Sequence, residues 1–93
     1  MVKIRAYIKL YRNVRRTPFR TGYRPLFDFI EEMKTSGRID LIDRKQFYPG
    51  DEGEVKIVFL NRDYLGDDFD IGKTFLFGEG SDPLGEGVVK EIL

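Results

Sequence analysis

Five arginines lie close together in the first quarter of this 93-residue sequence, in a segment without any acidic residue. The cluster consists of Arg12, Arg15, Arg16, Arg20 and Arg24. A guanidinium group keeps its charge at any physiological pH, and its planar donors match the geometry of phosphate oxygens. Tyr11 and Tyr23 lie within the same segment. This pattern indicates a surface that binds a nucleic-acid backbone by neutralising phosphates and releasing counterions.

The same arginines have a second interpretation, because the chain is strongly polarised in charge. Residues 1–24 carry eight bases and no acid, whereas residues 25–93 carry the other eight bases and all sixteen acids. The arginines can therefore pair with carboxylates of the same domain, although an exposed ion pair stabilises a protein by only about 0–1 kcal/mol. Both interpretations stay open on the sequence. The clustering of arginines on one loop favours the binding patch.

The remaining residue types offer little catalytic chemistry. The chain contains no His and no Cys, so the commonest general base and the usual zinc and haem ligands are missing. Asp63, Asp67, Asp68 and Asp70 could bind calcium through oxygen ligands, but their spacing matches no EF-hand, and a solvated acidic loop is the better interpretation. The glycine-rich stretch 78–87 lacks the Gly-Lys-Ser/Thr sequence of a phosphate-binding loop. We therefore expect a non-enzymatic protein without a cofactor or a metal.

The segments around the arginine cluster alternate between apolar and polar residues with a period of two, which is typical of strands. The alternation predicts strands over residues 2–10, 23–29, 38–41, 54–59, 73–77 and 85–93. The stretch 26–33 also fits a short amphipathic helix, and periodicity alone does not exclude that alternative. Residues 13–22 are expected to form a loop, because they show no period and contain Pro18 and Gly22. Residues 61–72 are expected to form a long exposed acidic loop.

Six short strands and no long helix predict an all-β fold, either an antiparallel barrel or a sandwich, in a single domain spanning residues 1–93. Eight Phe and five Tyr with no Trp predict an aromatic core. The absence of Cys suggests a reducing compartment, and no stretch has the length or apolar character of a signal peptide or membrane span. We therefore expect a cytoplasmic location and no membrane partner.

Three motifs, read in order, resemble the C-terminal barrel of bacterial elongation factor Tu. That family has the pattern R-H-T-P-F-x-x-G-Y-R-P-x-F-x-F after its first strand, then P-G-D, and finally R-E-G-G before a terminal G-x-G-V-V strand. Here the segments RRTPFRTGYRPLFDF, YPGDEGEVKIVFL and GEGVVKEIL carry the likeness, which spans nearly the whole chain. The resemblance implies a six-stranded antiparallel β-barrel. It implies no GTPase activity, because the motifs of the family's GTPase domain do not occur here.

The resemblance also implies a set of residues facing tRNA. Position by position this set consists of Arg15, Arg16 in place of a His, Ser36 in place of a Thr, Glu79 and Gly80. Several family positions differ: Gly78 and Asp82 replace arginines, Asn61 replaces a phosphate-binding lysine beside Arg62, and Leu26 replaces a Gln. These departures weaken the family type of tRNA contact.

The sequence thus predicts a non-catalytic domain that binds structured RNA such as tRNA. Arg15, Arg16 and Arg20 together with Ser36, Glu79 and Gly80 are the predicted contact residues. The alternative is a protein-interaction module that mimics or docks with the translation GTPase machinery. The better match of the barrel-building motifs, compared with the phosphate-contacting ones, motivates this alternative.

Overall fold

The structure is a computed structural model that describes residues 1–93, and it is all-β as predicted. Its strands are β1 (Val2–Leu10), β2 (Leu26–Ile30), β3 (Met33–Ser36), β4 (Arg38–Leu41), β5 (Glu52–Phe59), β6 (Thr74–Gly78) and β7 (Pro83–Ile92). The only helical element is the three-residue 3-10 turn η1 (Arg62–Tyr64), so no helix has the length that a bilayer span requires.

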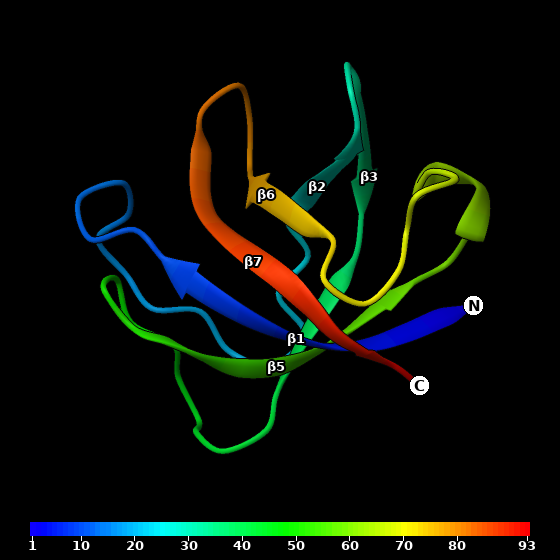
Figure 1. The fold of residues 1–93 in the computed structure, drawn as a ribbon. Coiled ribbons are helices and arrows are strands. Elements are labelled where there is room, and N and C mark those ends of the chain that lie inside the picture. Colours follow the sequence, from blue (N-terminus) through cyan, green and yellow to red (C-terminus); the bar gives the residue numbers. More distant parts are fainter.

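The seven strands form one antiparallel sheet that curls on itself in the order β3-β2-β6-β7-β1-β5-β4 (Figure 1). β3 and β4 stand at the two ends of this order, yet only Gly37 separates them in the chain. One bent segment therefore pairs with β2 through its first half and with β5 through its second half, which brings the two ends of the sheet together. The barrel architecture is confirmed, with seven strands where six were predicted.

The additional strand comes from the segment for which a helix was the alternative. Leu26–Ile30 and Met33–Ser36 form a hairpin, and the turn between them includes Glu32 at a φ of 64°. A left-handed conformation is unusual for a glutamate, which explains why composition does not reveal this turn. The helix alternative for residues 26–33 is wrong. The strand predicted over residues 23–29 begins three residues later, at the position after Pro25.

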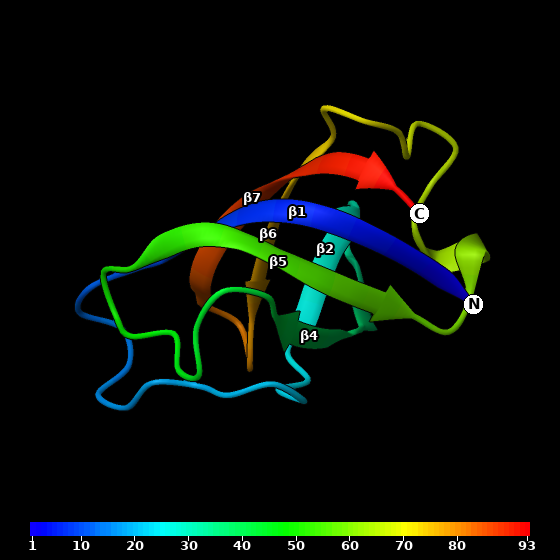
Figure 2. The ribbon, with the colours of Figure 1, turned by 90° about the horizontal axis from the view of Figure 1, so that it is seen from below.

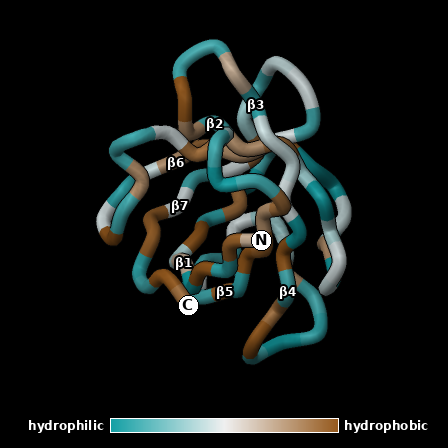
Figure 3. The backbone as a smooth tube through the Cα atoms, turned by 90° about the vertical axis from the view of Figure 1, so that its right-hand side faces the viewer, coloured by the Kyte–Doolittle hydropathy of each residue, from teal (hydrophilic) through white to brown (hydrophobic).

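The interior of the barrel is a single apolar cluster rich in phenylalanine, in agreement with the predicted aromatic core. Alternate residues of β1 point inward, as shown by the full burial of Ile4, Ala6 and Ile8. Figure 3 shows the corresponding alternation of hydrophobic and hydrophilic positions along the backbone. The loop 61–72 is only partly exposed, which corrects the expectation from the sequence, because Leu65 and Phe69 are buried in the core.

Two glycines of β7 let the phenylalanines of β6 pack closely against the strand. A Cβ on Gly85 would lie 2.3 Å from the carbonyl oxygen of Lys9 and 2.4 Å from the Phe77 ring. A Cβ on Gly87 would lie 2.5 Å from the Phe75 ring. Gly85 and Gly87 therefore serve close packing in the barrel.

Candidate nucleic-acid interface

The loop between β1 and β2, residues 11–25, carries the five clustered arginines and is called the basic loop below. Two aromatic residues anchor it to the barrel. Phe19 is buried and exchanges two backbone hydrogen bonds with Phe47, of 3.0 and 2.9 Å, and their rings stack at 5.2 Å. Tyr23 stacks on Phe19 at 4.6 Å, and its carbonyl oxygen accepts from the Ile39 amide of β4 at 2.8 Å. The predicted loop is therefore held at defined points, while four of its five arginines are exposed.

Arg15 is held within the domain by three contacts. Its Nη1 donates to Glu79 Oε2 at 2.7 Å, and its Nε donates to the carbonyl oxygen of Thr17 at 2.8 Å. The guanidinium carbon also lies 4.8 Å from the centre of the Tyr23 ring, a cation-π distance. The Arg15 side chain is only 21% exposed to solvent, whereas the Glu79 side chain is 56% exposed.

Tyr23 completes this contact, because its hydroxyl donates to the same Glu79 oxygen that accepts from Arg15. Partial burial of the phenol and the hydrogen bond to the Glu79 carboxylate raise the pKa of Tyr23 well above its ordinary value. Both effects disfavour the phenolate. The hydroxyl is therefore a permanent donor at physiological pH. Arg15, Tyr23 and Glu79 form a closed unit, which we call the Glu79 clamp.

The other four arginines of the basic loop make no ion pair within the domain. Arg12, Arg16, Arg20 and Arg24 are all exposed, and no carboxylate lies within 4.0 Å of their charged groups. Elsewhere, Arg5, Arg38 and Arg44 pair with acids, and Arg62, which makes no ion pair, donates to the Gly66 carbonyl oxygen. The free arginines of the domain are therefore concentrated on this loop.

A shallow hollow opens between these arginines and the turn that precedes β5. Three arginines line it, Arg12, Arg15 and Arg16, together with Pro49 and two further loop residues, and no acid does. Gly50, at a φ of +92°, leaves room for the Arg12 guanidinium, which would lie 3.3 Å from a Cβ at this position. The hollow has the charge that a phosphate group requires.

The remaining predicted residues lie at the same end of the barrel. Figure 2 shows the basic loop passing beneath the hairpin that joins β6 to β7, where Glu79 and Gly80 form the turn. Ser36 is exposed at the end of β3; it lies opposite Leu26 of β2, which in turn lies opposite Gly78 of β6. The structure thus gathers the predicted set on one surface. It pairs Arg15 and Glu79 with each other, while Arg16 and Arg20 are free of ion pairs.

In the family that this chain resembles, a phosphate-binding lysine occupies the position of Asn61. Asn61 is not part of this surface. Asn61 follows β5 at the opposite end of β1, where its side chain caps η1 by accepting from the Asp63 amide at 2.9 Å. The adjacent Arg62 donates to the Gly66 carbonyl oxygen at 2.9 Å and lies 5.1 Å from the centre of the Phe69 ring. Both residues have structural roles here.

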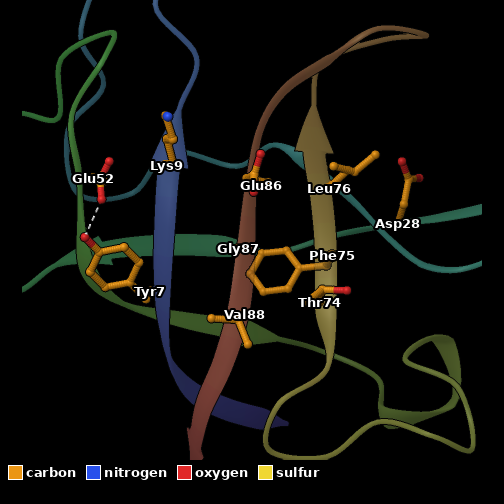
Figure 4. Close-up of a pocket in the computed structure, with 10 residues that line it drawn as sticks. All are labelled: Tyr7, Lys9, Asp28, Glu52, Thr74, Phe75, Leu76, Glu86, Gly87 and Val88. Carbon is orange, nitrogen blue, oxygen red and sulfur yellow. Dashed lines mark hydrogen bonds between the residues drawn. The ribbon is translucent and has the colours of Figure 1, made fainter.

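A second hollow, of about 760 Å³, lies on the outer face of β1, β7 and β6 and was not predicted from the sequence (Figure 4). Glu52 accepts from the Tyr7 hydroxyl at 2.8 Å, and Glu86 accepts from the Tyr11 hydroxyl at 2.9 Å. Lys9 lies opposite both glutamates in the strand register but makes no ion pair.

The aspartates for which calcium was considered do not form a ligand cluster. No group of three or more His, Cys, Asp or Glu side chains is arranged to hold a metal ion, and Asp68 pairs instead with Lys73 at 2.6 Å. The sequence matches no known protein-family model. The basic loop and the turn at Glu79 together form the candidate interface.

Proposed function

We propose that this domain binds structured RNA, such as tRNA, through the basic loop. The observation that carries this proposal is that Arg12, Arg16, Arg20 and Arg24 are exposed and unpaired on one anchored loop without acids. An unpaired surface guanidinium gains free energy from contact with a phosphate and releases condensed counterions when it binds. Recognition would depend on charge and on the shape of the RNA backbone, with little reading of base identity.

The likeness to the C-terminal barrel of elongation factor Tu supports the same proposal from the sequence. The all-β barrel agrees with the fold that this likeness implies, and the basic loop contains the residues of its longest motif. The RNA would lie along the basic loop and reach the turn at Glu79 and Gly80. Ser36 lies at the edge of this surface.

The test is a double substitution, Arg16→Ala with Arg20→Ala, measured by fluorescence anisotropy with labelled tRNA across a salt series. Removing two phosphate contacts should lower the magnitude of the slope of log K against log salt by about 1.4–1.8. Lys56→Ala with Lys90→Ala is the matched control, because it removes the same charge from exposed, unpaired positions on other strands. Equal slopes for the two double variants would show that the basic loop is not the RNA-binding surface.

A protein-interaction module is the second candidate, and two observations favour it. Arg15 and Glu79, which the resemblance assigns to the RNA contact, already satisfy each other in the Glu79 clamp. Large apolar side chains are also exposed near the N-terminus. Met1 is 78% exposed, and Leu60, which follows the β5 residue paired with Val2, is 71% exposed. Capture from a lysate treated with ribonuclease separates the candidates. A defined protein retained on the wild type but lost from a Leu60→Lys variant would support this second function.

A further inference from the structure

The end of the barrel opposite the basic loop carries the complementary charge. The turn Glu31–Glu32 and the loop 60–73 contain six acids and two bases, whereas the basic loop contains five bases and no acid. These regions lie at opposite ends of β1. The basic loop follows Leu10, the last residue of β1. The loop 60–73 follows β5, whose last residue Phe59 pairs with Val2 at the start of β1. Figure 1 shows the two loops on opposite sides of the barrel.

Most of the charges at the acidic end are not used within the molecule. Asp68 pairs with Lys73, but Glu31, Glu32, Asp63, Asp67 and Asp70 make no ion pair. All five are exposed. The chain therefore presents free carboxylates at one end and free guanidinium groups at the other, although its net charge is zero.

The acidic end also has the shape and the apolar surface of a contact region. A shallow hollow between the β2–β3 turn and the loop after β5 is lined by Glu31, Asp63, Asp67 and Asp68, together with Lys73, which pairs with Asp68. Next to it, Tyr64 is 47% exposed and Ile71 is 63% exposed. An arginine side chain suits such a hollow, because its aliphatic stem can cover apolar surface while its head group meets carboxylates.

We infer that the basic loop of one copy docks on the acidic end of a second copy, so that molecules associate head to tail. Charge complementarity favours a second copy as the partner, because every chain carries both the basic loop and the acidic end. The contact is heterologous, and its two surfaces lie at opposite ends of the barrel. Each added molecule therefore leaves one free end of each sign, and the product is an open chain of weakly held copies. RNA on the basic loop would compete with this contact.

The experiment uses two charge-reversal variants and sedimentation velocity at low salt. One variant carries Arg16→Glu and Arg20→Glu, which removes the basic surface. The other carries Glu31→Lys and Asp67→Lys, which removes the acidic hollow. Each variant alone should stay at the monomer mass of 10.9 kDa. Their equimolar mixture should associate, because the intact basic loop of one variant meets the intact acidic end of the other.

The wild type should show an average mass that rises with concentration and falls with salt, with the association constant reduced at least about tenfold between about 50 and 300 mM salt. A variant with Lys56→Glu and Lys90→Glu should associate like the wild type, although its net charge changes as much as in the first variant. Circular dichroism of each variant verifies folding. Arg20→Ala replaces the reversal at the basic loop if that variant does not fold, and Asp67→Asn replaces the reversal at the acidic end.

Three results would overturn the inference: a wild type that stays monomeric at low salt, a mixture that forms no complex, or variants that still associate alone. The inference does not rest on RNA binding. If tRNA binds while the mixture stays monomeric, the proposed function holds and head-to-tail association is wrong. If the mixture forms its complex but tRNA does not bind, the basic loop serves association alone.

Discussion

The Glu79 clamp makes a specific prediction about the substitution Glu79→Gln. Glutamine keeps the size of the side chain and can still accept a hydrogen bond from Tyr23, but it removes the charge that holds Arg15 at 2.7 Å. Because the Glu79 side chain is 56% exposed, the ion pair is partly screened by solvent, and its loss should cost about 0.5–1 kcal/mol of stability. This corresponds to a decrease in melting temperature of about 2–6 °C.

The effect on RNA binding should have the opposite sign. Releasing Arg15 adds one guanidinium to the free set of the basic loop and removes one carboxylate beside it. One further phosphate contact steepens the salt slope by about 0.7–0.9, which at about 0.1 M salt corresponds to about five- to eightfold tighter binding. Anisotropy of labelled tRNA across a salt series measures both quantities, and thermal unfolding followed by circular dichroism measures the stability.

The matched control is Glu86→Gln. Glu86 also accepts from a tyrosine hydroxyl, that of Tyr11 at 2.9 Å, but it holds no arginine. This variant removes the same charge beside the same kind of hydrogen bond without freeing a guanidinium group, so its salt slope should match that of the wild type. An unchanged slope for Glu79→Gln would refute the idea that the clamp withholds Arg15. Weaker RNA binding would instead show that Glu79 contacts the RNA directly, as the family resemblance implies.

Further predictions concern the barrel and the ionisation of Tyr23. Gly85→Ala should destabilise the protein by about 2–3 kcal/mol in urea unfolding, because the new Cβ meets the Lys9 carbonyl oxygen at 2.3 Å, whereas Gly80→Ala, with no atom within 4 Å, should be nearly neutral. Phe27→Ala should cost about 3–5 kcal/mol, because the ring is fully buried; a loss below about 1 kcal/mol would contradict the assigned core. The pKa of Tyr23 is raised from 10.0, so its contribution to stability should be complete below about pH 10 and should be lost as the pH rises through the pKa of the folded state. Tyr23→Phe should therefore reduce the slope of stability against pH above about pH 10, and an unchanged slope in alkaline unfolding experiments would argue against the Glu79 clamp.

The strands and the core were largely predictable from the sequence, because alternation in β1 and β5 is strong and both strands bury one face. The hairpin β2–β3 was only half predicted, since its turn uses Glu32 in a left-handed conformation and β3 is exposed along most of its length. No periodic signal marks such a strand. Leu65 and Phe69 were placed in an exposed loop, because the surrounding aspartates concealed two residues that complete the core.

The location of the candidate site was predictable, but its internal pairing was not. Charge counting identified the basic loop, and the motif resemblance added the turn at Glu79. That Arg15 contacts Glu79, sixty-four residues later in the chain, depends on how the basic loop passes beneath the β6–β7 hairpin. Tyr23 is half-buried, with its ring packed against the core and its hydroxyl in the clamp. Neither contact has a signature in composition or spacing.

The most direct test of the central claim is the affinity of the wild-type domain for tRNA as a function of salt, measured by anisotropy. If Arg12, Arg16, Arg20 and Arg24 each neutralise one phosphate, log K should fall with log salt at a slope of about −3. Binding of this slope, reduced by about half in the Arg16→Ala and Arg20→Ala variant, is the predicted result. Absence of binding at about 50 mM salt, where the phosphate term is strongest, would contradict the claim.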